Sequence, residues 1–217
     1  MPPTAGSSTA DAARAATAGS GAVLYLDVGD PECLLAAERA LQVMPVVTEW
    51  IPVHLGPPAS IDADSLARTA GARGLQPLRL PAALPFDAEA ANLAATYAKS
   101  TGRAVAFLQA ALRQAYAGAR DLSVVDNVLI AGSACELHPR ALIKALGTSG
   151  TRRTLEAATA LARERGVTRA PAVFALGRVF AGDAGLDEAA AALRAAGPAP
   201  GTTEDAPPLI VLPPAGR

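Results

Sequence analysis

The residue types most suited to chemistry gather in one short turn, Asp30-Pro31-Glu32-Cys33. The turn follows an apolar run rich in strand-forming residues, 22–28, and precedes a stretch with helical periodicity. Asp30 is placed to cap this helix, with Pro31 at the first helical position. Backbone N–H groups and the helix dipole favour a charged carboxylate there, so we predict a lowered pKa for Asp30. Asp30 would then be either a weak general base or a plain helix cap.

Cys33 is the second candidate catalytic residue, although it has no cysteine partner within its turn. The other cysteine, Cys135, lies about a hundred residues further on, which is neither a dithiol motif nor a zinc spacing. The helix start would lower the pKa of the Cys33 thiol, whereas the charges of Asp30 and Glu32 would raise it. The alternative is a buried, inert thiol. Because the chain has only two histidines, we predict no metal site.

The overall composition restricts the class of partner. Of the 217 residues, 51% are hydrophobic, 18% are charged and 4% are aromatic, and the formal net charge is −1. A near-neutral chain with few aromatic side chains lacks the features of a nucleic-acid-binding surface. No uncharged apolar run of about 18 residues occurs, so we predict no membrane span. The N-terminal stretch lacks the pattern of a secretory signal, and we expect a cytoplasmic protein.

The order of the predicted elements indicates one α/β domain at residues 22–196, with disordered tails at 1–21 and 197–217. Strands are predicted at 22–28, 46–55, 171–176 and 179–181. Helices are predicted at 30–44, 64–74, 87–100, 103–117, 123–132, 138–147, 151–164 and 186–196. The strands at the two ends of the domain must share one sheet, because neither group is large enough alone. The helices at about 87–150 then form an inserted subdomain.

Two local signals shape this assignment of elements. Pro52 lies within the second predicted strand, and because proline lacks an N–H group we expect that strand at an edge or at a bulge. Ser123 and Asp126 resemble a capping box at the start of a helix, with Asp in place of the usual Glu.

Three segments, taken in order, are similar to those of a known family: 24–35, which contains the Asp30 turn; 74–81 with 85–87; and 166–173 with 177–183. Through them the chain resembles the DsbA-like branch of the thioredoxin superfamily. The resemblance is to the 2-hydroxychromene-2-carboxylate isomerases and the related kappa-class glutathione transferases in particular. It covers roughly residues 22–196.

The resemblance implies a thioredoxin-like sheet with an inserted helical subdomain, and a cis peptide bond between Ala170 and Pro171. It also implies a site where this loop faces the helix start. The implied substrate-binding residues are Pro31, Glu32, Asp87, Ala170, Pro171 and Asp183. Dithiol relatives carry Cys at both ends of the turn, and glutathione-using relatives carry Ser where this chain has Asp30. The family's ligand-binding Asp after the hairpin glycine falls on Ala184, beside Asp183.

These comparisons favour an isomerase-like or transferase-like enzyme over a dithiol oxidoreductase. Asp30 would act as the base or polariser, and backbone N–H groups at the helix start would stabilise developing negative charge. We expect a small-molecule substrate of aromatic or carbonyl-bearing type, with a homodimer as one option for assembly. Glutathione is the one cofactor implied, and we expect its use to be disfavoured because Asp30 would repel its thiolate. The alternative function is non-catalytic binding of a ligand or peptide.

Overall fold

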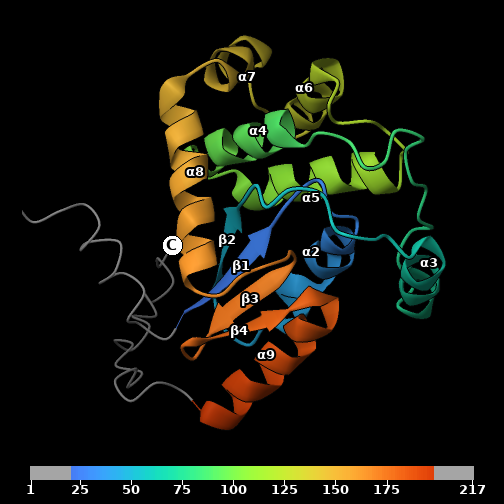
Figure 1. The fold of residues 1–217 in the computed structure, drawn as a ribbon, viewed down its shortest axis with the longest axis vertical. Coiled ribbons are helices and arrows are strands. Elements are labelled where there is room, and N and C mark those ends of the chain that lie inside the picture. The colour runs from blue at the N-terminus through green and yellow to red at the C-terminus, as the bar shows by residue number, and fades with distance from the viewer. Residues whose placement is uncertain (1–20, 198–217) are drawn as a thin grey trace, which may run out of the picture.

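A computed structural model describes residues 21–197. The predicted tails, 1–21 and 197–217, therefore lie outside the described residues except for their innermost positions. In this part of the chain, four strands form one mixed sheet, and helices cover both of its faces (Figure 1). The predicted α/β class with inserted helices is confirmed. Among residues 21–197, no helix has the length and apolar character needed to cross a membrane.

The sheet has the order β2-β1-β3-β4. Its strands are β1 (Ala22–Leu26), β2 (Thr48–Pro52), β3 (Ala172–Ala175) and β4 (Arg178–Ala181). The central strand β1 pairs in parallel with β2 and antiparallel with β3, and every residue of β1 is buried. A fully buried central strand explains its continuous apolar sequence. Strand β2 lies at an edge, as Pro52 predicted.

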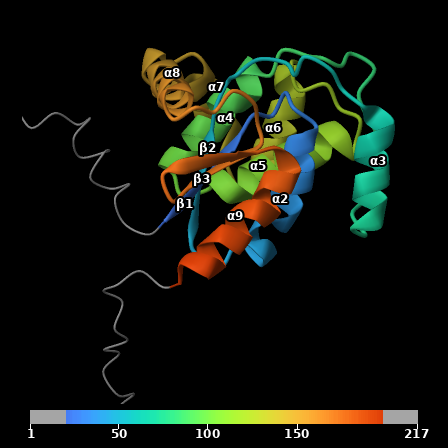
Figure 2. The ribbon, with the colours of Figure 1, turned by 60° about the horizontal axis from the view of Figure 1, so that its bottom comes forward.

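The helices are α2 (Glu32–Val43), α3 (Ala63–Ala72), α4 (Glu89–Ser100), α5 (Ala104–Tyr116), α6 (Val125–Ser133), α7 (Pro139–Leu146), α8 (Ser149–Glu164) and α9 (Gly182–Ala196). Helices α4 to α7 are inserted between β2 and β3, and α8 returns the chain to the sheet (Figure 1). Helices α2 and α9 lie side by side along the sheet in both views (Figure 2). Helix α3 stands beside α2 on the outside of the molecule.

The core is divided by the sheet. Leu24 and Leu26 of β1 face a large cluster built with α2, α4, α5 and α9. Val23 and Tyr25 face a smaller cluster on the other side, where Ala162 of α8 packs. This alternation along one strand is the period of two expected of a sheet with both faces covered. The sheet therefore holds the end of β1, and the turn that follows it, between two packed layers.

Predictions at the starts of α9 and α6 were wrong for local reasons. Helix α9 begins at Gly182 rather than at residue 186, because its first turn contains two glycines and looks like a loop in sequence. Helix α6 has no side-chain cap, so the predicted capping box is absent. The amide of Ser123 instead donates to the side chain of Asp121, 2.8 Å away, in a tight turn before the helix.

Candidate functional site

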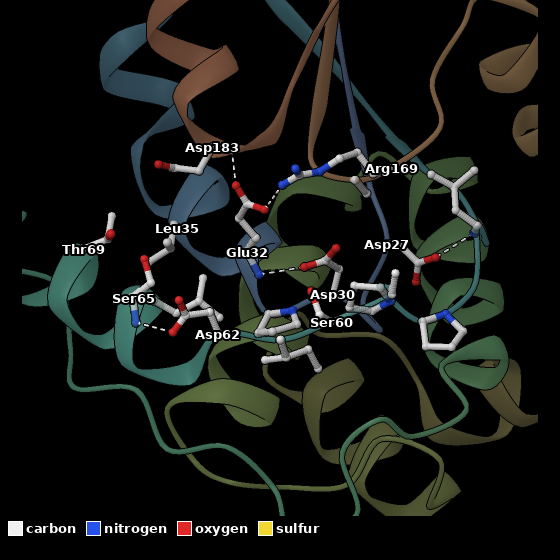
Figure 3. A pocket seen from close by; sticks show the side chains of 18 of the residues that line it. Asp27, Asp30, Glu32, Leu35, Ser60, Asp62, Ser65, Thr69, Arg169 and Asp183 are labelled. Atoms are coloured by element: carbon white, nitrogen blue, oxygen red, sulfur yellow. Dashed lines mark hydrogen bonds and ion pairs between the residues drawn. The ribbon is translucent and has the colours of Figure 1, made fainter.

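A groove with a volume of about 830 Å³ lies at the end of β1, where the turn enters α2. Four further segments complete its walls: the loop 55–62, helix α3, the loop before β3, and the start of α9. Figure 3 shows Asp30 near the centre of this groove, with Asp27, Glu32 and Arg169 around it. A concave site of this size, with mixed polar and apolar walls, is suited to a small molecule.

Asp30 is held by the local geometry of the helix start. Its Oδ1 accepts a hydrogen bond of 2.9 Å from the amide of Glu32, and its own amide donates to the carbonyl of Asp27 at 3.1 Å. The residue is only 7% exposed. Burial raises the pKa of Asp30 from 3.8 to about 7, with a smaller contribution from the neighbouring charge of Glu32. The predicted lowering of this pKa is therefore wrong, because removal from water outweighs the hydrogen bond from the helix start.

The amide groups at the start of α2 already have acceptors within the chain. The amide of Glu32 is bound to the Asp30 side chain, the amide of Cys33 to the Asp30 carbonyl at 3.0 Å, and Pro31 has no N–H group. The expected stabilisation of substrate charge by these amides is thus not supported by their hydrogen bonds. What the turn presents to the groove is a carboxyl group.

Glu32 ties the turn to the far end of the domain. One of its carboxylate oxygens accepts from the amide of Asp183 at 2.7 Å, and the other pairs with Arg169 (Figure 3). The carboxylate of Asp183 is in turn paired with Arg39 at 3.3 Å and with Arg73 of the α3 C-terminus. Both arginines that line the groove, Arg73 and Arg169, are therefore already neutralised by carboxylates.

Asp27, which lines the groove, forms a buried polar pair with Asn92. Asn92 Nδ2 donates to Asp27 Oδ1 at 2.7 Å, and Asn92 Oδ1 accepts from the amide of Val28 at 3.0 Å. The Asp27 carboxyl also accepts from the amides of Gly29 and Leu55. Every one of these interactions fixes the chain where β1 ends. The pair is a structural support for the turn that carries Asp30.

A smaller pocket of about 290 Å³ lies on the other side of Asp27. His54 and Asp87 line it, and Asp87 caps the amide of Glu89 at 2.9 Å. His54 Nδ1 lies 3.2 Å from Asn92 Nδ2. Because both protons of this amide then have acceptors, the hydrogen-bond pattern assigns the proton of neutral His54 to Nε2.

Cys33 points away from the groove and into the core. Its exposed fraction is 0%, and burial together with the charge of Asp30 raises the pKa of its thiol. Cys33 and Cys135 are both free and buried. This arrangement is that of the inert thiol named as the alternative above.

The structure gathers five of the predicted site residues around the groove: Asp30, Pro31, Glu32, Ala170 and Asp183. Three lie elsewhere. Cys33 is in the core, Asp87 is exposed beside the smaller pocket, and Pro171 is buried behind the groove with its carbonyl bound to the amide of Gly182. The peptide bond between Ala170 and Pro171 is cis.

Sequence reasoning gave no role to Arg39, Arg73, Arg169 or Asn92. The three arginines lie on polar stretches that look like ordinary solvated surface, so they carry no local signal. Asn92 does carry one, because it is a polar residue among alanines on the apolar side of a predicted helix, and such a residue needs a buried partner. Within residues 21–197 there is no cluster of three or more His, Cys, Asp or Glu side chains placed to hold a metal ion.

No protein-family model matches the sequence, and no curated protein matches it. Solved structures do match. A 2-hydroxychromene-2-carboxylate isomerase aligns over 81% of this chain and 95% of its own, at 16% identity and a TM-score of 0.70. A probable DsbA oxidoreductase from Streptomyces coelicolor aligns over 81% of this chain and 89% of its own, at 19% identity and a TM-score of 0.67.

The cytosolic disulfide reductase DsbM from Pseudomonas aeruginosa, in its structure with GSH, covers 81% of this chain and 98% of its own. Its identity is 16% and its TM-score 0.58. Sequence identities this low establish the fold and leave the chemistry to be argued from the groove. With its β2-β1-β3-β4 sheet, its inserted helices and the turn at the end of β1, the chain has the DsbA-like thioredoxin fold that these isomerase and oxidoreductase structures share.

Proposed function

We propose that this protein is an isomerase-like enzyme in which Asp30 moves a proton on a small molecule held in the groove. The observation that carries the proposal is the position of one carboxyl group, that of Asp30, in the lining of an 830 Å³ groove although its residue is only 7% exposed. Only one oxygen of that carboxyl is hydrogen-bonded to another described residue. The second oxygen is therefore available to a substrate.

The acid–base character of Asp30 suits this role. A pKa of about 7 leaves comparable amounts of the acid and the carboxylate at neutral pH, which is the condition under which one group can both remove and return a proton. The carboxylate would take a proton from a carbon next to a carbonyl or imine, and the acid would return it to a neighbouring atom. The atoms of the substrate are conserved, and no oxidant or reductant is needed.

The absence of a second cysteine in the turn supports proton transfer over thiol exchange. The position that a dithiol relative uses for its exposed cysteine holds Asp30, and Cys33 is buried with a raised pKa. The compartment, the use of glutathione and a homodimer remain predictions from sequence.

The proposal is tested by proton exchange in D₂O. A panel of small aromatic ketones and imines is incubated with the full chain, and loss of the proton next to the carbonyl or imine is followed by NMR. We expect exchange that rises with pH to a plateau, with a midpoint near 7, and that falls at least about a hundredfold in Asp30→Asn. Asp126→Asn is the matched control, because Asp126 is an exposed residue of α6. Exchange that is unchanged in Asp30→Asn would remove Asp30 from the mechanism.

A non-catalytic ligand-binding protein is the second candidate. It is favoured by the internal hydrogen bonds of the Glu32 and Cys33 amides, because these donors are then not available to stabilise charge on a reacting ligand. Binding of a panel compound in the groove, without proton exchange at any pH, is the result that this candidate predicts.

A further inference from the structure

We propose that the groove selects small molecules that carry a protonated amine, and that the ammonium group binds to Asp30. This inference goes beyond the proposed function and rests on the same groove and the same oxygen of Asp30. A bound ammonium group would occupy the oxygen that takes the proton, so an amine is a ligand that competes with the substrate of proton transfer. It is carried by the placement of charged side chains around one incompletely paired carboxyl group.

The acceptor for the ammonium group is the second carboxyl oxygen of Asp30. Asp30 lines the groove, and the residue is only 7% exposed. Its Oδ1 is bound to the amide of Glu32, whereas its Oδ2 has no partner within residues 21–197. Figure 3 shows this carboxyl between the Glu32 and Asp27 side chains. The residue is largely buried, but this oxygen is open to the groove, so a ligand there can supply the donor that the protein does not.

Among the described residues that line the groove, both cations are committed to carboxylates of the chain. Arg169 is paired with Glu32, and Arg73 is paired with Asp183. The carboxyl residues that line the groove outnumber these two arginines, and they are Asp27, Asp30, Glu32, Asp62 and Asp183. A ligand carboxylate would therefore enter a field of its own sign, whereas an ammonium group would be attracted.

The remaining walls describe the rest of the ligand. Leu35, Leu55, Ile61 and Leu66 supply apolar surface, and they come from α2, the loop 55–62 and α3. An apolar or aromatic body beside a single ammonium group fits both parts of this lining. Tryptamine has this form, and it has two matched analogues: tryptophol, in which a hydroxyl replaces the amine, and indole-3-acetate, which carries a carboxylate.

Binding of an ammonium group is coupled to the ionisation of Asp30, because the cation favours the carboxylate over the acid. The charged or titratable groups whose fields reach Asp30 are Asp27 at the end of β1, Glu32 and Cys33 of α2, Tyr116 of α5, and Arg169 before β3. With the Asp30 pKa at about 7, the affinity for tryptamine should be about ten times higher at pH 8 than at pH 6. The amine stays protonated throughout this range.

The experiment is an NMR titration of the isotope-labelled full chain with each of the three indole compounds at pH 6 and pH 8. We expect tryptamine to bind most tightly, with shifts at Asp30, Glu32 and the loop 55–62, and with the stated tenfold pH effect. We expect tryptophol to bind more weakly and without pH dependence, and indole-3-acetate to bind weakest of all. Proton release when tryptamine binds at pH 7, measured by calorimetry in two buffers, reports the same coupling without a mutation.

The variant Asp30→Asn keeps the acceptor for the Glu32 amide and removes the charge. It should reduce tryptamine affinity at pH 8 by about a hundredfold, as the tenfold pH effect requires of an uncharged side chain, and abolish the pH effect, whereas Asp126→Asn should leave both unchanged. Indole-3-acetate binding as tightly as tryptamine, no tryptamine binding at millimolar concentration, or equal affinities at the two pH values would overturn the inference.

These outcomes are separable from those of the proposed function. A groove that prefers indole-3-acetate while Asp30 still titrates near 7 removes the amine and leaves proton transfer by Asp30 in place. An Asp30 carboxyl that titrates near 4 in the free protein removes the proposed acid–base role itself.

Discussion

The amide of Glu32 donates a 2.9 Å hydrogen bond to one carboxyl oxygen of Asp30, and the other oxygen of that carboxyl has no partner among the described residues. The Asp30 side chain thus caps the start of α2 and also lines the groove. The hydrogen bond from the helix start favours the ionised carboxylate, whereas burial favours the neutral acid. Because burial is the larger effect, the turn presents a carboxyl group that titrates near neutrality.

The raised pKa of Asp30 has a measurable effect on stability. Folding favours the protonated acid, so its contribution to stability is complete below the ordinary pKa of 3.8 and is lost as pH rises to about 7. In the wild type, the free energy of unfolding should therefore decline by at most about 4 kcal/mol over this range. This decline should be absent in Asp30→Asn, which has no carboxyl group at this position. Denaturant unfolding at a series of pH values measures it, with Asp126→Asn as control. Parallel pH profiles for wild type and Asp30→Asn would contradict the assignment.

The Cys33 thiol should be unreactive in the folded protein. Its exposed fraction is 0% and its pKa is raised, so neither access nor thiolate is available. In a Cys135→Ser variant, a disulfide-exchange reagent at pH 8 should label no thiol until denaturant is added, and then one. A Cys33→Ser variant identifies the signal of Cys135. A mixed disulfide at Cys33 in the folded variant would instead support thiol chemistry.

Asn92 should be required for stability, although it lies outside the groove lining. Asn92→Ala leaves the Val28 amide without its acceptor and removes one donor from the Asp27 carboxyl, both of them buried. We expect a loss of about 3 kcal/mol in the free energy of unfolding, measured with denaturant. Asn127→Ala is a matched control, because Asn127 is also helical and its side chain makes one hydrogen bond, to the Asp121 carbonyl. Its expected cost is about 1 kcal/mol, and equal costs would show that the buried pair has no special weight.

The ion pair between Arg73 and Asp183 should hold α3 against the groove. Arg73→Ala removes this link, and because the pair is partly exposed the global stability should fall by less than about 1 kcal/mol. Amide hydrogen exchange in Ala63–Ala72 should nevertheless become several-fold faster, since local opening of α3 is no longer restrained. The exposed Arg68 of the same helix provides the control variant, Arg68→Ala. Unchanged exchange in Arg73→Ala would mean that α3 is held by other contacts.

The parts of the fold that could be predicted are those with local signals. The apolar run of β1, the helix start after Asp30 and the edge position of Pro52 each follow from a few adjacent residues. The prediction that strands from the two ends of the domain share one sheet followed from counting strands. Boundaries failed where glycines disguised a helix, as at the start of α9.

The electrostatics of the groove could not be predicted in the same way. The Asp183 carboxylate is paired with Arg39 and Arg73, which precede it by 144 and 110 residues. The burial of Asp30 also depends on distant segments, since the loops 55–62 and 168–170 form the walls around it. The sequence indicates a helix start at Asp30, but it does not indicate how deeply the Asp30 carboxyl is buried. For that reason the predicted direction of the Asp30 pKa shift was wrong.

The hydrogen bond from the Asp183 amide to Glu32 joins residues 151 positions apart, and β1 gains its second neighbour only when Val23 meets Phe174. A chain emerging from the ribosome must therefore be synthesised past residue 174 before both edges of β1 are paired. Until then one edge of β1 is open to pairing with other chains, which makes this stage of synthesis the one most exposed to aggregation. The groove also includes the start of α9, so a nascent chain has no complete groove until this helix has docked.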